Sequence, residues 1–396
     1  MRRHRLLLWA SLLTIALTSL FLSCQPIPPL HLHRDKQVEI GYHLIRIDLN
    51  VFWQYRLDYD DDHPYDYREF WTYGWDRTDE QLFGPIGYTE PNTFELRRYH
   101  LGETPHVPHT NMDPHLIEGR TYVDEYELGY YDILVWNELH SRDEVLSTVV
   151  DEEATLDSVS GWTNMSFNSL PYRSKYNRAF NQPEEIFTAY ERDIEITDNL
   201  DDYDYYDPET NTYYKNLDME LNPITYIYLI QIRLHHNYRR VVESITGSSN
   251  LSGVSRGAVF NSGISFDDPV TVHYDTRLKR DCVIKESGEI VDVIGGRCLT
   301  FGITDQNSAK IYRRADVRDK ERHYVDANMI FYNGLDSTFV FDVTDSIRKY
   351  YKGGVITIDL DLDTVPIPVR AGGNGFDAVV EDFKEELHEF EVTKDK

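Results

Sequence analysis

Alternation of apolar and polar residues is the dominant pattern along this chain. In residues 45–53 every second residue is apolar, from Ile45 to Trp53. The same period recurs in residues 226–234 and 355–363. A period of two puts one side of a strand on a core and the other side in water. Similar but shorter segments predict further strands at residues 132–136, 192–197, 241–244, 270–274, 298–303 and 337–343.

Helical periodicity is rare. Residues 345–351 could form a short turn of helix, with Thr344 or Asp345 as its cap. Residues 376–387 have helix-like apolar spacing, but they fit strands broken by a bulge equally well. Nothing resembles alternating βαβ units. The pattern therefore predicts an all-β protein built of stacked antiparallel sheets.

One polar stretch divides the chain. Residues 198–216 are rich in Asp, Asn and Tyr and contain little that could build a core. We interpret them as a linker between an N-terminal β-sandwich domain at residues 33–197 and a C-terminal one at residues 217–396. The chain is long enough for two domains of ordinary size.

The N-terminus carries an export signal. Three arginines within the first five residues precede an apolar run at residues 6–22, and a small residue, Ser23, precedes Cys24. This basic, apolar, small order is typical of a secretory signal, and a cysteine at the cleavage point is what lipoprotein processing requires. We expect residues 1–23 to be removed and Cys24 to carry the lipid. The alternatives are an ordinary signal with a chance cysteine and an uncleaved membrane helix, which the short, partly polar run disfavours.

The residues that follow fit a tether. Residues 24–32 include three prolines, which favour an extended stalk. Two or three acyl chains hold a protein in a bilayer, whereas one short chain binds only reversibly. We therefore expect a protein that is anchored in a membrane by its N-terminal lipid.

The net charge excludes one class of partner. The chain carries −28, and removing the three signal arginines gives −28 − 3 = −31 for the mature protein. We therefore expect no nucleic-acid binding. Residues 202–207 are acidic but lack the turn glycine and closing glutamate of a calcium loop, so we expect no metal site and no cofactor.

Two cysteines remain after lipidation. Cys282 and Cys298 flank an expected hairpin at residues 283–297. In an exported protein they could form a disulfide worth about 3 kcal/mol. They could equally be two buried free thiols.

Catalytic chemistry finds little support, and we expect no enzyme. The chain has no Gly-rich phosphate loop and no His-Glu-x-x-His motif, and in so acidic a chain carboxylate pairs occur by chance.

Aromatic residues are more informative about binding than the carboxylates are. Trp71 and Trp75 lie in a loop containing Gly and Asp, so they are candidate exposed contacts for a protein or a glycan.

Several segments together resemble a known group. Residues 127–137 are similar to a strand of fimbrial-anchor and fimbrillin-like lipoproteins of gut and oral anaerobes, and residues 225–234 to the strand that opens their second domain. Further similar segments follow in the same order, at residues 245–247, 250–253, 298–302, 341–344 and 375–383. The match is to an uncharacterised branch of that group.

The resemblance implies two transthyretin-like β-sandwich domains. It also implies that the protein anchors or assembles fimbriae with fimbrillin-like subunits through β-strand addition. Cys24 matches the lipid-bearing cysteine, and the lack of a distinctive arginine cleavage site in the first domain favours an anchor. The resemblance further implies an outer-membrane protein exposed at the cell surface, but no acidic cluster follows Cys24, which leaves the periplasmic face open as an alternative. A glycan-binding surface lipoprotein is the alternative function.

Overall fold

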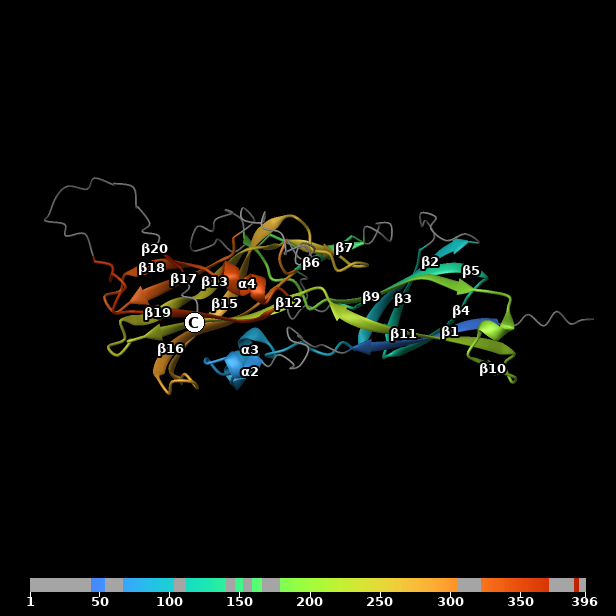
Figure 1. Cartoon of the computed structure of the whole chain (residues 1–396), viewed down its shortest axis with the longest axis horizontal. Helices are drawn as coiled ribbons and strands as arrows, with labels where there is room; N and C mark the ends of the chain where they lie inside the picture. The colour runs from blue at the N-terminus through green and yellow to red at the C-terminus, as the bar shows by residue number, and fades with distance from the viewer. Residues whose placement is uncertain are drawn as a thin grey trace, which may run out of the picture.

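The chain forms an elongated molecule with one large curled β-sheet towards each end (Figure 1). Strands dominate and helices are short, which confirms the all-β prediction. This computed structural model describes residues 44–53, 67–102, 112–139, 147–151, 159–165, 179–304, 322–369 and 388–391. The segment 376–387, with its helix-like spacing, lies outside the described residues.

The first sheet has eight strands, in the spatial order β3-β2-β5-β9-β11-β1-β4, with β10 paired to β11. In β1, Ile47, Leu49 and Val51 are at most 2% exposed, whereas Phe52 is 50% exposed. The two-residue period therefore identified the buried face of this strand correctly. The strands are β1 (Leu44–Trp53), β2 (Thr93–Gly102), β3 (Met112–Glu118), β4 (Thr121–Glu125), β5 (Gly129–Asn137), β9 (Phe187–Ile196), β10 (Tyr205–Asp207) and β11 (Thr212–Pro223).

The second sheet has nine strands, in the order β19-β12-β16-β15-β13-β17-β18-β20, with β8 paired to β15. Its main core collects the inward residues of these strands, among them Ile230, Val272, Phe339 and Ile358, each at most 2% exposed. The strands are β8 (Ala179–Phe180), β12 (Tyr226–His235), β13 (Val242–Ser255), β15 (Pro269–Val283), β16 (Ile290–Thr300), β17 (Tyr324–Phe331), β18 (Asp336–Asp342), β19 (Gly354–Asp361) and β20 (His388–Glu391).

Both sheets contain parallel pairs, so the prediction of purely antiparallel sheets was wrong in part. The pairs β1–β11, β12–β19, β8–β15 and β18–β20 are parallel. Asn50 of β1 and its partner Asp218 of β11 are 168 residues apart. A parallel neighbour needs a long crossover, and periodicity indicates which face is buried but not which strand lies alongside.

Residues 198–216, which we predicted as a linker, are instead part of the first sheet. They contain the short helix η2 (Leu200–Asp202), β10 and the start of β11. Tyr205 and Tyr214 stack across this pair with ring centroids 4.4 Å apart and planes 5° from parallel. Stacked tyrosines therefore support a strand pair where the sequence has few aliphatic residues.

A small third sheet joins the two large ones. Its order is β14 (Gly257–Val259), β7 (Ser160–Thr163) and β6 (Thr148–Val150). Beside it, Trp136 of β5 and Phe260 are each 1% exposed, with ring centroids 5.5 Å apart. This buried cluster joins Trp136 of the first sheet to Ala258 of β14 and to Phe301, which directly follows β16 of the second sheet, so the two large sheets meet at a seam.

The helices hold connections in place. α2 (Tyr67–Phe70) and α3 (Arg77–Phe83) lie against the second sheet (Figure 1), although most strands of the first sheet follow them in the chain. Between them, the hydroxyl of Tyr73 donates to Asp79 Oδ1 at 2.7 Å, and both residues are buried. α4 (Thr344–Lys349) is the turn of helix that the sequence predicted.

Candidate functional site

The predicted lipidation site, Cys24, lies outside the described residues, but the strand that follows it has a defined position. In β1, Leu44 pairs with Thr212 and Trp53 pairs with Leu221. Because β11 continues past Leu221 towards the seam and β12, β1 begins at the end of the molecule away from the second sheet (Figure 1). A tether preceding β1 would therefore enter at this pole.

No helix among the described residues has the length and apolar character needed to span a bilayer.

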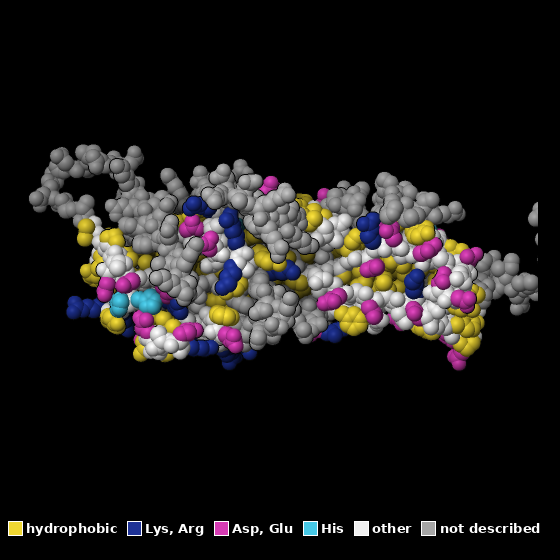
Figure 2. All heavy atoms as spheres, viewed as in Figure 1, with side chains coloured by type: hydrophobic (Ala, Val, Ile, Leu, Met, Phe, Trp, Pro, Cys, Tyr) yellow, Lys and Arg dark blue, Asp and Glu magenta, His cyan; other side chains and the backbone are white. Residues whose placement is uncertain are grey.

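The outer strands of the first sheet carry charges and a proline. Arg46 pairs with Glu125 of β4 at 2.9 Å, and Arg98 with Asp124 at 3.3 Å. Pro114 lies within the outer strand β3. Figure 2 shows acidic and basic side chains intermixed over this sheet. Charges and proline on outer strands are the usual protection against pairing with another chain.

The outer strands of the second sheet also carry charges, but they contain no proline. β19 pairs with β12 alone among the described residues, and its Asp359 and Asp361 lie beside His235 and His236. At the other end of the sheet, β20 pairs in parallel with β18, placing His388 opposite Phe339 and Phe390 opposite Phe341. The edge of β18 thus holds a four-residue strand from a distant part of the chain. Parallel pairing is the slightly weaker type of strand pairing.

The two tryptophans predicted as contact residues lie together, but not as an exposed platform. Trp71 is 4% exposed, and its indole Nε1 donates to the carbonyl of Gly74 at 3.0 Å. Its ring centroid is 5.3 Å from that of Tyr73 and 6.1 Å from that of Trp75, which is partly buried. The expectation that Trp71 is exposed was wrong, because these rings cover the outer face of β12 and β16.

The two cysteines are free, so the disulfide alternative was wrong and the alternative of buried thiols is confirmed. Cys282 packs with Trp71 on one face of the second sheet, whereas Cys298 lies in the main core. Cys282 also pairs in register with Val291, seven residues before Cys298 on β16. Seven residues of strand span about 23 Å, far beyond the reach of a disulfide. Burial raises the pKa of Cys282 to about 11.

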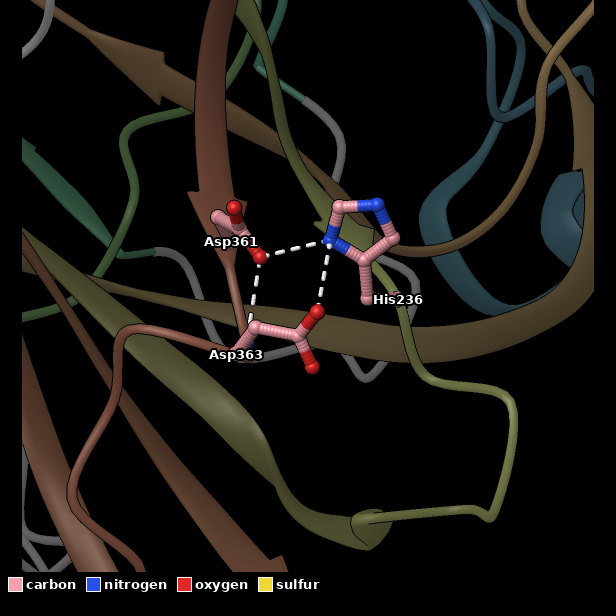
Figure 3. Close-up of side chains that lie close together, drawn as sticks. All are labelled: His236, Asp361 and Asp363. Atoms are coloured by element: carbon pink, nitrogen blue, oxygen red, sulfur yellow. Dashed lines mark hydrogen bonds and ion pairs between the residues drawn. The ribbon is translucent and has the colours of Figure 1, made fainter.

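A cluster of histidines and carboxylates lies where β12 and β19 end (Figure 3). Nδ1 of His236 is 2.7 Å from Oδ1 of Asp361 and 3.5 Å from Oδ2 of Asp363. The hydrogen bond to Asp361 raises the pKa of His236. Beside it, His235 Nε2 lies 2.8 Å from Asp359 Oδ1. These groups satisfy one another, and they hold the two strand ends together.

One motif with a catalytic pattern was missed in the sequence. Residues Gly253–Gly257 read Gly-x-Ser-x-Gly, the pattern of a hydrolase nucleophile. Such a serine stands exposed on a strand-to-helix turn. Here Ser255 ends β13, is 1% exposed, and its hydroxyl lies 2.8 Å from the carbonyl oxygen of Gly257 and 2.9 Å from that of Phe266. This serine therefore has a structural role.

Comparison with known proteins gives similarities to solved structures only. No family model matches the chain, and no curated protein matches it. A protein assigned as an adhesin, from Bacteroides ovatus, has a TM-score of 0.48 at 11% identity, over 84% of this chain and 97% of that one. The fimbrial anchor protein Mfa2 from Porphyromonas gingivalis has a TM-score of 0.40 at 11% identity, over 80% and 90%.

A third structure, assigned as a polysaccharide-binding protein with a domain of unknown function (DUF1812), comes from Bacteroides thetaiotaomicron. It has a TM-score of 0.40 at 8% identity, over 80% of this chain and 92% of that one. The similar structures thus include one fimbrial anchor protein. At 8–11% identity, nothing about ligands or partners follows for this chain.

Proposed function

We propose that this protein is a lipid-anchored, fimbrillin-like protein of the cell envelope that holds an adhesive surface filament by β-strand addition. The observation that carries the proposal is the placement of its two ends. β1, which follows the predicted lipid stalk, starts at one pole, and the β18–β20 edge lies in the sheet at the opposite end. A lipid on Cys24 would thus direct the second sheet away from the membrane.

The two sheets suit these two tasks. The charged outer strands of the first sheet resist addition of another strand. In the second sheet, β18 already holds β20, and we propose that β20 is the strand exchanged with the partner subunit. Main-chain hydrogen bonds supply the affinity in such exchanges, and alternating side chains supply the specificity. The sequence of β20 and the residue that follows, His388-Glu389-Phe390-Glu391-Val392, alternates as this requires.

The anchor is tested by its chemistry. Metabolic labelling with a palmitate analogue should mark the protein, and Cys24→Ala should abolish both the label and the membrane association. A matched Cys282→Ala variant should keep both. Mass spectrometry that finds a free thiol on Cys24 in the mature protein would remove the anchor from the proposal.

The exchange is tested by locking β20 in place. Val340 and Glu389 are register partners across β18 and β20, so Val340→Cys with Glu389→Cys should form a disulfide there. The locked protein should lose co-purification with filament subunits from outer membranes, and a reductant should restore it.

A second lock serves as the control. Asp48→Cys with Val123→Cys would join register partners of β1 and β4 in the first sheet, and it should leave co-purification unchanged. If the β18–β20 lock leaves filament subunits bound, exchange at this edge is wrong.

A further inference from the structure

A cleft of about 630 Å³ opens at the seam between the two large sheets. One wall comes from the end of α3 and the chain between α3 and β2, with Phe83 and Asn92, and another from the chain just before β9, with Gln182. The floor comes from β16 of the second sheet, through Arg297 and Leu299. Small-molecule sites commonly have volumes of roughly 300–1,000 Å³ and lie between domains, so this cleft has the size and position of a ligand site.

Internal hydrogen bonds fix the walls. The two carboxylate oxygens of Glu184 accept the backbone N–H groups of Ser147 and Thr148 at 2.6 and 2.8 Å. Asn137 donates to the carbonyl of Glu185 and accepts the backbone N–H of Phe187, both at 2.7 Å. The side chains of Glu184 and Asn137 are therefore held before any ligand arrives, and their positions set the shape of the cleft.

One buried cation in the cleft is only partly satisfied. Nη2 of Arg297 donates to Glu185 Oε1 at 2.5 Å, and Glu185 Oε2 accepts the N–H of Thr89 at 2.7 Å. The Arg297 side chain is 9% exposed, and its buried Nε has no hydrogen-bond partner. A buried donor without a partner costs free energy. A ligand oxygen beside this guanidinium, with a small shift of the side chain, would recover that cost.

The remaining polar groups define what could bind. Oε1 of Gln182 accepts a hydrogen bond from the backbone N–H of Leu299 at 2.8 Å, so the amide N–H groups of Gln182 can donate to a ligand. Asn92 and Asp275 are exposed side chains on the rim. Amide, carboxylate and guanidinium groups together both donate to and accept from hydroxyl groups, and Phe83 adds an aromatic surface.

We infer that this cleft binds a neutral saccharide of one or two rings. An anion would meet five carboxylates against the single guanidinium of Arg297: those of Glu90, Glu138, Glu184, Glu185 and Asp275. A cation gains little from most of them, because the oxygens of Glu184 and Glu185 already accept hydrogen bonds and Glu90 forms an ion pair with Arg120. Hydroxyl groups suit both the donors and the acceptors. This binding is separate from strand addition and holds whether or not β20 is exchanged.

The test is direct binding of the mature chain to a panel of neutral mono- and disaccharides, including glucose, galactose, mannose, N-acetylglucosamine, lactose and maltose. Saturation-transfer NMR identifies a binder, and calorimetry gives its affinity. Asn92→Ala with Asp275→Ala should weaken that affinity at least ten-fold, because both remove hydrogen-bonding groups from the rim. Both positions are exposed, and an unchanged Tm verifies the fold.

The control is Asp267→Ala, an exposed aspartate outside the cleft, which should bind as the wild type does. The inference is overturned if no sugar of the panel binds, or if the rim variant binds as well as the control. It is also overturned if spermidine or glucuronate binds in the cleft and the neutral sugars do not.

Discussion

A buried aspartate in the second sheet offers a sharp test of the structure. Asp326 of β17 is 6% exposed, and its Oδ1 accepts a hydrogen bond from Asn250 Nδ2 of β13 at 2.7 Å. Oδ1 of Asn250 in turn lies 3.2 Å from Nδ1 of His273 on β15. Three neighbouring strands thus share one polar row, in which a single amide faces the buried carboxyl group.

Burial raises the pKa of Asp326 from 3.8 to about 7, and the hydrogen bond from Asn250 offsets only part of this effect. Below pH 3.8 the carboxyl group is protonated in both the folded and the unfolded chain. Between pH 4 and 7 the unfolded chain ionises while the folded chain keeps its proton, so stability falls as the pH rises. The difference between 3.8 and about 7, at about 1.36 kcal/mol for each pH unit, amounts to about 4 kcal/mol.

The perturbation is Asp326→Asn, which keeps the shape and the acceptor for Asn250 but cannot ionise. Urea unfolding followed by tryptophan fluorescence at pH 4 and pH 8 measures both proteins. We expect similar stability at pH 4, and a variant more stable than the wild type by on the order of 4 kcal/mol at pH 8. Asp267→Asn, at an exposed position, should track the wild type at both pH values. A difference between Asp326→Asn and wild type that does not change with pH would refute the reasoning.

Two further predictions concern the segment that crosses to the second sheet and the cysteines. Tyr73→Phe removes a buried hydrogen bond to Asp79 and should lower the free energy of unfolding by about 1.5–3 kcal/mol; equal stability in urea unfolding would contradict this. Because Cys282 and Cys298 are unbridged, a reductant should leave the Tm unchanged, and thiol titration of the denatured mature protein should detect both side chains. Loss of either thiol into a disulfide would show that the separation of these two cysteines is wrong.

The sequence predicted most strongly what depends on local periodicity. Alternation alone predicted that Ile47, Ile230 and Ile358 of β1, β12 and β19 point into the core, and each is at most 2% exposed. For β12 the prediction that the other face meets water was wrong, because Ile227, Leu229 and Gln231 on that face are buried as well. The sequence also predicted a turn of helix at residues 345–351, where the structure has α4. A strand's period is a property of the strand itself, so these features need no knowledge of the neighbours.

The features that failed depend on partners far away in the chain. The Gly and Asp around Trp71 predicted an exposed loop, but that loop crosses to the second sheet, where Gln231 accepts the N–H groups of Thr72 and Tyr73 at 2.8 and 3.2 Å. The strand pairing at residues 198–216 failed for a related reason, because its support is ring stacking rather than an aliphatic pattern. The seam cleft could not be predicted, since its lining is assembled from six separate stretches of sequence.

The seam gives the proposed anchor a mechanical basis. If the lipid enters at one pole and a filament joins at the other, any pull on the filament passes through the contact between the two sheets. Besides the chain that connects β11 to β12, this contact includes the pairing of β14 with β7 and the packing of Phe260 on Trp136. The ion pair between Arg297 and Glu185, whose side chains are 9% and 19% exposed, adds a further contact at the seam. A ligand in the cleft would touch both sheets beside this ion pair, so saccharide binding and load transfer would use the same part of the molecule.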